Sequence, residues 1–252
     1  MNETFTKMYF FKTKHIINCA TFLIIALFNL SCSEENNYNA KLKGNTMGTY
    51  YFVEVIDVPI KLKIKTIETE IENTLMHVNK ILSNWDKESE ISKINKFKKN
   101  TAIKISDELN EVFETATKIN IKSNGFFDLT IDPIIELWGF GYKSKKLESL
   151  PTESQIKNTL SFVGQKLFLK IDFEKNELTK KNENLKINLS SIGKGYGIDL
   201  IGKKLDQLGI KNYIINIGGD ILTKGYNSKK ENWVIGIENP NLEKKLIKEV
   251  VN

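Results

Sequence analysis

The chain has 252 residues, of which 37 are basic and 31 acidic, giving a formal net charge of +6. Every basic residue is Lys and none is Arg, which excludes recognition of phosphate or carboxylate by a guanidinium fork. With only two Cys and two His, a disulfide framework and a structural zinc cluster are also excluded. The Lys excess is scattered without interleaved aromatic residues, so we do not expect nucleic acid as a partner.

The amino-terminal residues predict an export signal. Three Lys precede a mostly apolar run at 16–30, which is shorter than the roughly 20 residues that a membrane span needs. Cys32 follows a small residue after this run, as in a bacterial lipobox. We expect residues 1–31 to be a lipoprotein signal peptide, 32–40 a polar tether, and the protein to be lipid-anchored to the membrane and to face the periplasm. An uncleaved anchor and a buried core helix are the alternatives.

The first half of the remaining chain carries clear periodic patterns. Residues 49–57 alternate and are rich in aromatic and β-branched types, which predicts a strand. Apolar residues at steps of three and four predict an amphipathic helix over 61–82, with His77 on its flank. Ser106 has the chemistry of an N-cap for a second helix, and Gly125 lies just past the end of that helix.

The second half alternates strands and one helix. Its patterns predict a hairpin over 167–180, a helix over about 194–208, and strands at 185–189, 212–217 and 233–238. Strands and helices mix without a regular βαβ alternation. The expected fold class is therefore α+β, with mixed or antiparallel sheets packed against helices.

Several segments contain residues that packing alone does not explain. Residues 44–49 place two Gly around small polar residues, which suits either close approach to a ligand or an ordinary turn. Trp85 lies in the polar stretch 83–95, where its ring would either stack on a flat heterocycle or cover the core. Asp128 and Asp132 offer acceptor oxygens to a ligand or to neighbouring groups.

Another such segment, 188–199, surrounds Lys194 with glycines where a predicted strand gives way to a helix. Backbone N–H groups at a helix start attract phosphate, and a nearby ammonium adds to this attraction. The spacing matches neither a Walker A loop nor a dinucleotide fingerprint. Gly218 and Gly219 form a further turn that permits close approach.

The order of the motifs is more specific than any one of them. From about residue 44 to 240, the motifs resemble the ApbE family of FAD:protein FMN transferases: TMGT, SNWDKESEISKIN, FFDLTIDPIIELWGFG, NLSSIGKGYGID, NIGGDI and WVIGIENP. This resemblance implies one ApbE-like, T-fold-related catalytic domain over 41–252. It also implies an enzyme that cleaves FAD, attaches FMN through a phosphoester bond to a Thr or Ser of a target protein, and releases AMP. The implied acceptors are subunits of exported or membrane redox complexes.

The resemblance also implies individual roles, although it assigns no catalytic base. Mg²⁺ is the implied metal ion, and Ser191 would offer it an oxygen. Asn188 stands where the family commonly has Asp, so a negative charge is absent there. The residues implied to contact FAD are Met47, Trp85, Phe126, Phe127, Asp128, Asn188 and Lys194.

The family pattern continues past WVIGIENP into a segment that completes the metal site. The residues after Pro240 are too few to hold that segment, so we expect the C-terminal part of the domain to be missing. Two alternatives stay open at this point: a non-catalytic FAD-binding lipoprotein and a Mg²⁺-dependent FAD pyrophosphatase.

Overall fold

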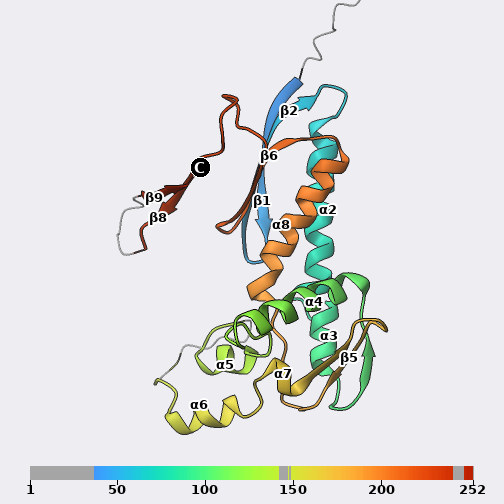
Figure 1. The fold of residues 1–252 in the computed structure, drawn as a ribbon, viewed down its shortest axis with the longest axis vertical. Coiled ribbons are helices and arrows are strands. Elements are labelled where there is room, and N and C mark those ends of the chain that lie inside the picture. The colour runs from blue at the N-terminus through green and yellow to red at the C-terminus, as the bar shows by residue number, and fades with distance from the viewer. Residues whose placement is uncertain (1–36, 142–146, 148, 241–246, 252) are drawn as a thin grey trace, which may run out of the picture. The chain divides into compact units, whose positions relative to one another are not determined.

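The computed structural model of the chain describes residues 37–141, 147, 149–240 and 247–251. The predicted signal peptide and Cys32 lie outside these residues. The chain from Asn37 onward clusters as one unit, and its elements are labelled in Figure 1. In the part of the chain that the structure describes, no helix combines the length and apolar character that a membrane crossing requires.

The main sheet is antiparallel, with the strand order β1-β2-β6-β7. Its strands are β1 (Asn37–Thr46), β2 (Thr49–Pro59), β6 (Asn212–Ile217) and β7 (Asp220–Lys224). The predicted tether is therefore wrong for residues 37–40, which begin the edge strand β1. Ala40 and Leu42 are buried while the residues between and around them are largely exposed, so the strand resembles a polar linker in sequence.

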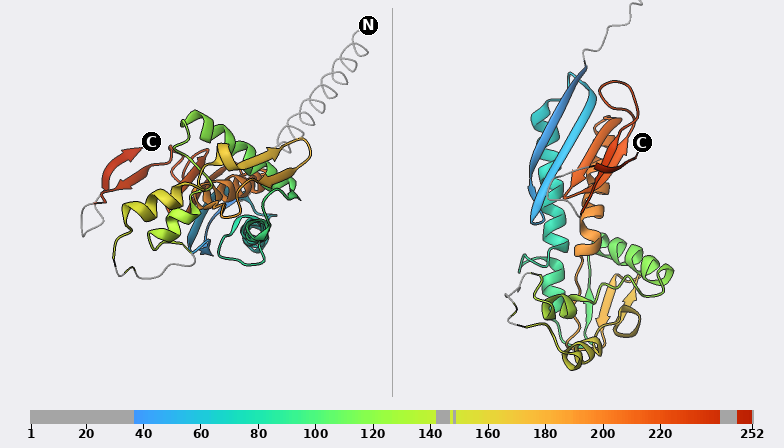
Figure 2. Two further views of the ribbon diagram at one scale, coloured as in Figure 1. Left: turned by 90° about the horizontal axis from the view of Figure 1, so that it is seen from below. Right: turned by 90° about the vertical axis from the view of Figure 1, so that its left-hand side faces the viewer.

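Two long helices, α2 (Ile64–Leu82) and α8 (Ser190–Gln207), run side by side against the main sheet (Figures 1 and 2). Their buried faces and the sheet enclose what we call the main core, which includes Ile67, Ile71 and Ile201. The structure confirms the helix predicted over 61–82. The third predicted helix begins earlier than expected, at Ser190 instead of about residue 194.

A second antiparallel sheet has the order β3-β5-β4. It consists of β3 (Ala102–Lys104), β4 (Leu169–Asp172) and β5 (Glu177–Lys180), and it packs with α3 (Glu90–Lys96) and α4 (Asp107–Lys122) around the second core. The predicted hairpin and the N-cap are confirmed, since the Ser106 side chain accepts a hydrogen bond from the N–H of Leu109. The remaining elements are α5 (Asp132–Leu137), α6 (Glu153–Leu160), α7 (Gln165–Phe168) and a hairpin of β8 (Ile235–Glu238) and β9 (Ile247–Val251).

Every strand pair among the described residues is antiparallel, and the sheets pack with helices, which confirms the α+β class. The strand predicted at 185–189 is absent. The N–H of Ile187 donates to Oδ1 of Asn95 at 2.8 Å, and its carbonyl accepts from Nδ2 of Asn95 and of Asn84, both at 2.8 Å. The side-chain amides of Asn84 and Asn95 thus form the hydrogen bonds to the Ile187 N–H and carbonyl that a neighbouring strand would form in a sheet.

Lys180 is fully buried in the smaller sheet. Its ammonium and that of Lys186 each donate to the backbone carbonyl of Asn95, at 3.0 Å in both cases. Burial and the neighbouring Lys186 lower the pKa of Lys180 to about 8. Because the ordinary pKa is 10.5, the unfolded chain binds more protons between pH 8 and 10.5, and this group makes stability rise with pH across that window.

We expect Lys180→Met to raise the free energy of unfolding at pH 7 by about 1–2 kcal/mol, because it removes a buried charge while Lys186 still donates to Asn95. Urea unfolding at pH 7 and pH 10 should show that this gain shrinks at the higher pH. The exposed neighbour is the control, and Lys181→Met should change stability little at either pH. A loss of stability in Lys180→Met at pH 7, or a gain independent of pH, would contradict this interpretation.

Candidate functional site

A pocket of about 170 Å³ lies at the edge of the second core, and Met47, which packs against both cores, forms part of its wall. Helix α2 reaches both cores, with Leu75 in the main core and Val78 and Leu82 in the second. The pocket is smaller than the roughly 300–1,000 Å³ typical of ligand sites, so it accommodates part of a large ligand. Its lining consists of Met47, Val78, Asn79, Leu82, Ser83, Asn84, Trp85, Leu189, Ser190, Gly193 and Lys194.

Met47 enters the pocket from the turn between β1 and β2. Met47 and Gly48 both have positive φ, at 50° and 72°, which is the backbone of a two-residue hairpin turn. A Cβ atom at Gly197 of α8 would lie 3.1 Å from Cε of Met47. The TMGT motif is therefore a tight turn that also delivers a side chain to the pocket, and Gly197 makes room for that side chain.

Trp85 lies in the loop that joins α2 to α3, and 68% of its surface is exposed. This exposure excludes the interpretation that its ring covers the core. The loop itself is well fixed, because Oγ of Ser83 accepts from the N–H of Trp85 at 3.2 Å and the carbonyl of Ser83 accepts from Oγ of Ser89 at 2.6 Å. A large flat ring on a fixed loop at the edge of the pocket is well placed to stack on a planar ligand.

Lys194 lies within α8 and not at the junction of a strand with the helix, because α8 already begins at Ser190. Glycines 193, 195 and 197 are helical, and Gly193 and Gly197 are buried where the helix passes close to its neighbours. The ammonium of Lys194 lies 3.0 Å from Oδ2 of Asp220 and 3.5 Å from the carbonyl of Gly218. Ser190 in the first turn of α8 and Lys194 one turn later form part of the pocket wall.

Asn188 is buried beside the start of α8 and holds two segments together. Its Nδ2 donates to Oδ1 of the fully buried Asp132 at 2.6 Å, and its Oδ1 accepts from the N–H of Ser190 at 2.9 Å. An Asp at position 188 would place a second carboxylate against Asp132, so the amide suits this environment. Ser191 is exposed and follows Ser190 in the first turn of α8, outside the pocket lining.

The structure does not place Phe126, Phe127 and Asp128 in the lining of this pocket. Phe126 is 95% exposed, whereas Phe127 is half-buried against the second core. Asp128 accepts from Oγ1 of Thr130 at 2.5 Å and from the N–H of Gln165 at 2.8 Å, which ties its segment to α7. Of the seven residues expected to contact FAD, Met47, Trp85 and Lys194 meet in the pocket, and Asn188 supports its wall.

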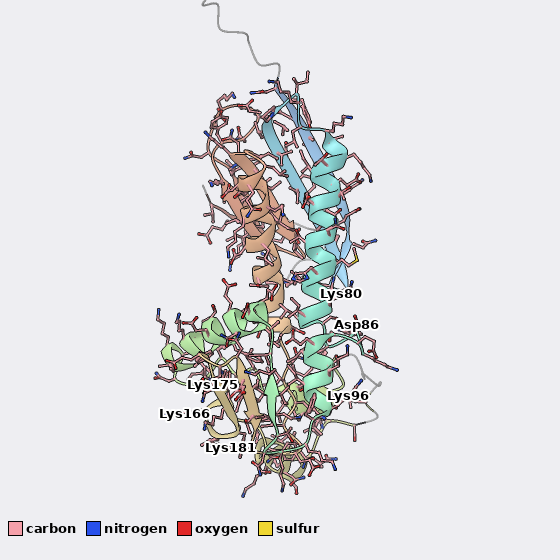
Figure 3. The ribbon with its side chains drawn as sticks, turned by 90° about the vertical axis from the view of Figure 1, so that its right-hand side faces the viewer. Lys80, Asp86, Lys96, Lys166, Lys175 and Lys181 are labelled. Carbon is pink, nitrogen blue, oxygen red and sulfur yellow. The ribbon has the colours of Figure 1, made fainter. Side chains whose placement is uncertain are left out.

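The sequence predicted no role for four polar residues of the pocket: Asn79, Ser83, Asn84 and Ser190. Asn79 lies beside the apolar stripe of α2, where a polar residue is normally solvated, so its sequence carried no signal. It also lines a neighbouring hollow of about 460 Å³ with Lys80 and Asp86, which Figure 3 labels at the end of α2 and in the loop after it. Among the described residues, no group of three His, Cys, Asp or Glu side chains could hold a metal ion.

Comparison with known sequences identifies the family. The model of the ApbE family matches residues 47–252. The FAD:protein FMN transferase of Buchnera aphidicola subsp. Schizaphis graminum (strain Sg) is 39% identical over 220 residues, covering 87% of this chain and 63% of that protein. The Haemophilus influenzae protein of the same name is 36% identical over 230 residues, covering 90% and 66%. The chain thus spans about two thirds of the length of these relatives.

Solved structures agree with this assignment. The flavin transferase ApbE from Vibrio cholerae superposes with a TM-score of 0.78 and 33% identity, covering 85% of this chain and 68% of that one. The apo flavinyl transferase ApbE of Pseudomonas stutzeri gives a TM-score of 0.72 and 28% identity, covering 80% and 66%. The fold, the motifs and both comparisons therefore show that this chain belongs to the ApbE family.

Proposed function

We propose that the protein transfers FMN from FAD to a Thr or Ser hydroxyl of a target protein and releases AMP. The supporting observation is the pocket in which Met47, Trp85 and Lys194 meet at the start of α8. The pocket offers an aromatic face for a ring system and a cation beside a helix N-terminus for phosphate. Relatives that are similar to this chain in sequence carry the name FAD:protein FMN transferase.

The reaction exchanges one phosphorus–oxygen bond for another. The acceptor hydroxyl oxygen attacks the phosphorus of the FMN half, the bond to the AMP phosphate breaks, and the hydroxyl proton leaves to a base. Lys194 would bind and orient the pyrophosphate, and Trp85 would hold a ring in place. His77 pairs with Glu108 at 3.3 Å and does not line the pocket, so no residue is assigned as the base.

Mg²⁺ belongs to the proposal as the ion that would draw charge from the phosphates when bound. The described side chains alone do not fit a protein-enclosed metal site, since they contain no cluster of three suitable ligands. Mg²⁺ commonly keeps several waters and takes ligands from substrate phosphates, so it needs few protein groups. Ser191, exposed in the first turn of α8, is the residue we propose to offer it an oxygen.

We also propose that the protein is exported, anchored by a lipid on Cys32 and facing the periplasm. The acceptors would then be exported or membrane redox subunits. Growth with a radiolabelled fatty acid tests the anchor: label should be incorporated by the parent chain and lost in Cys32→Ser. Label that persists in Cys32→Ser would contradict the acylation of this residue.

The activity is tested by incubating the 252-residue chain with FAD, Mg²⁺ and an acceptor protein that carries a candidate Thr. Mass spectrometry should show FMN on the acceptor, with one AMP released for each FMN attached. AMP with free FMN and an unmodified acceptor would instead support the pyrophosphatase. Retained FAD without AMP would support the non-catalytic binder, which the amide at position 188 favours.

The contact between Met47 and α8 gives a prediction for affinity. We expect Gly197→Ala to weaken FAD binding by about tenfold, because the new methyl group would displace the end of the Met47 side chain by a few tenths of an ångström. Isothermal titration measures this change. Gly195→Ala is the matched control, since a Cβ there meets no atom within 4 Å. Equal affinities in the two variants would show that the Met47 contact does not matter for binding.

A further inference from the structure

The ammonium of Lys194 already has a partner in the free protein. It forms an ion pair with Asp220 at 3.0 Å, at the first residue of β7, and also donates to the carbonyl of Gly218 at 3.5 Å. Lys194 lines the pocket, whereas Asp220 does not. The carboxylate therefore engages, from outside the pocket, the same cation that the proposed function assigns to the pyrophosphate.

The position of Asp220 is set by the turn between β6 and β7. Gly218 has a φ of 55°, and a Cβ there would meet Cγ2 of Thr49 at 2.8 Å. The N–H of Gly218 donates to the carbonyl of Tyr50 at 3.0 Å, which fastens this turn to the hairpin that carries Met47. The backbone at Asp220 is thus held in place. Lys194, in contrast, reaches it through a flexible four-carbon stem.

An anion that enters the pocket must compete with this carboxylate. The Lys194 and Asp220 side chains keep 32% and 51% of their surface exposed, so their ion pair is a weak one that can be exchanged. A pyrophosphate carries more charge than one carboxylate and gains more from the same ammonium. It also suffers repulsion from Asp220 for as long as both lie near Lys194.

We propose that Asp220 is the counter-ion of Lys194, a positioning residue that is displaced from the ammonium when the phosphates bind. Asp220 holds the lysine extended toward the β6–β7 turn in the free protein. It also lowers affinity for small anions, such as pyrophosphate, that lack a ring for Trp85 to hold. This inference rests on the proposed function in one respect: the pyrophosphate of FAD is the group that binds Lys194.

Inorganic pyrophosphate is the direct probe, with binding to the full chain measured by isothermal titration at low ionic strength. We expect Asp220→Asn to bind pyrophosphate about tenfold more tightly than the parent, and Asp220→Ser to behave alike. In a Lys194→Met background, the same Asp220 substitutions should change the affinity at most twofold. The higher pyrophosphate affinity of the Asp220 variants should also shrink in high salt, because salt screens the repulsion between the Asp220 carboxylate and pyrophosphate.

The chain contains a matched control, a second ion pair that also joins β7 to α8. Lys224 pairs with Asp206 at 2.7 Å, away from the pocket, so Asp206→Asn removes a comparable ion pair without touching Lys194. We expect Asp206→Asn to leave pyrophosphate affinity unchanged. Unchanged or weaker binding by folded Asp220→Asn and Asp220→Ser, or an equal gain in Asp206→Asn, would overturn the inference.

Turnover of FAD separates this inference from the proposed function. If AMP is released from FAD but the Asp220 variants bind pyrophosphate as the parent does, the counter-ion inference alone fails. If no variant releases AMP but the predicted order of pyrophosphate affinities holds, the counter-ion inference stands and the transferase proposal fails.

Discussion

Replacing Trp85 by Ala is expected to weaken FAD binding by about 1–3 kcal/mol, or roughly 5- to 150-fold, which is the usual range for loss of an aromatic stacking partner. The ring is 68% exposed in the free protein, so its removal leaves no cavity in either core. The effect should therefore fall on the ligand and leave stability nearly unchanged. Isothermal titration with FAD and thermal unfolding of the same samples measure the two quantities separately.

Two further variants control this prediction. Trp85→Phe keeps an aromatic face and should retain most of the affinity. Trp138→Ala removes another partly exposed Trp, 39% exposed and outside the pocket lining, and should leave FAD affinity unchanged. If Trp85→Ala binds FAD like the parent, or unfolds at a much lower temperature, Trp85 is not a stacking residue.

Replacing Lys194 by Ala should also lower FAD affinity strongly. Hydrogen bonds to charged groups contribute about 1.5–3 kcal/mol, so we expect a loss of roughly 10- to 150-fold. The loss should be largest at low ionic strength, where the interaction between the ammonium and the phosphates is least screened. The measurement is the FAD dissociation constant of parent and variant as a function of salt.

Lys203 provides the comparison within α8. It pairs with Glu111 at 3.6 Å and lies outside the pocket lining, so Lys203→Ala removes the same charge from the same helix. This variant should keep the parent affinity and the parent salt dependence. Similar losses in both variants would mean that only the net charge of the protein matters, which would remove Lys194 from the site.

The sequence predicted those elements whose signals are local. The stripe of α2 follows from helical spacing, and the Ser106 cap follows from the hydrogen-bonding chemistry of one side chain. Strand β1 could not be predicted in this way. It is an edge strand with alternating exposed polar residues, and it gains its structure from pairing with β2.

Long-range contacts explain the other errors. The backbone at Ile187 is satisfied by Asn84 and Asn95, which lie about a hundred residues earlier in the chain. The glycines around Lys194 have a low helix propensity, so the start of α8 at Ser190 is not apparent from the sequence. In the structure they are helical, and a Cβ atom at Gly197 would lie only 3.1 Å from Cε of Met47, so Gly197 leaves room for that side chain.

Part of the site was nevertheless predictable. Met47, Trp85 and Lys194 come from three separate motifs, and the fold brings them together in one pocket. Family resemblance identified these residues, whereas Asn79 lies outside all the quoted motifs. Residues that line a pocket from the polar flank of a helix have the same composition as a solvated helix face, so only the three-dimensional arrangement distinguishes them.

We propose that part of FAD binds in the pocket lined by Met47, Trp85 and Lys194. The chain has four Met, and methyl-labelled Met observed by NMR reports on them individually. Met47 lines this pocket and Met76 lines the neighbouring hollow, so the two methyl groups distinguish the two locations. On titration with FAD, we predict a large ring-current shift of the Met47 methyl group and an unmoved Met76. A shift of Met76 with Met47 unmoved would contradict the account.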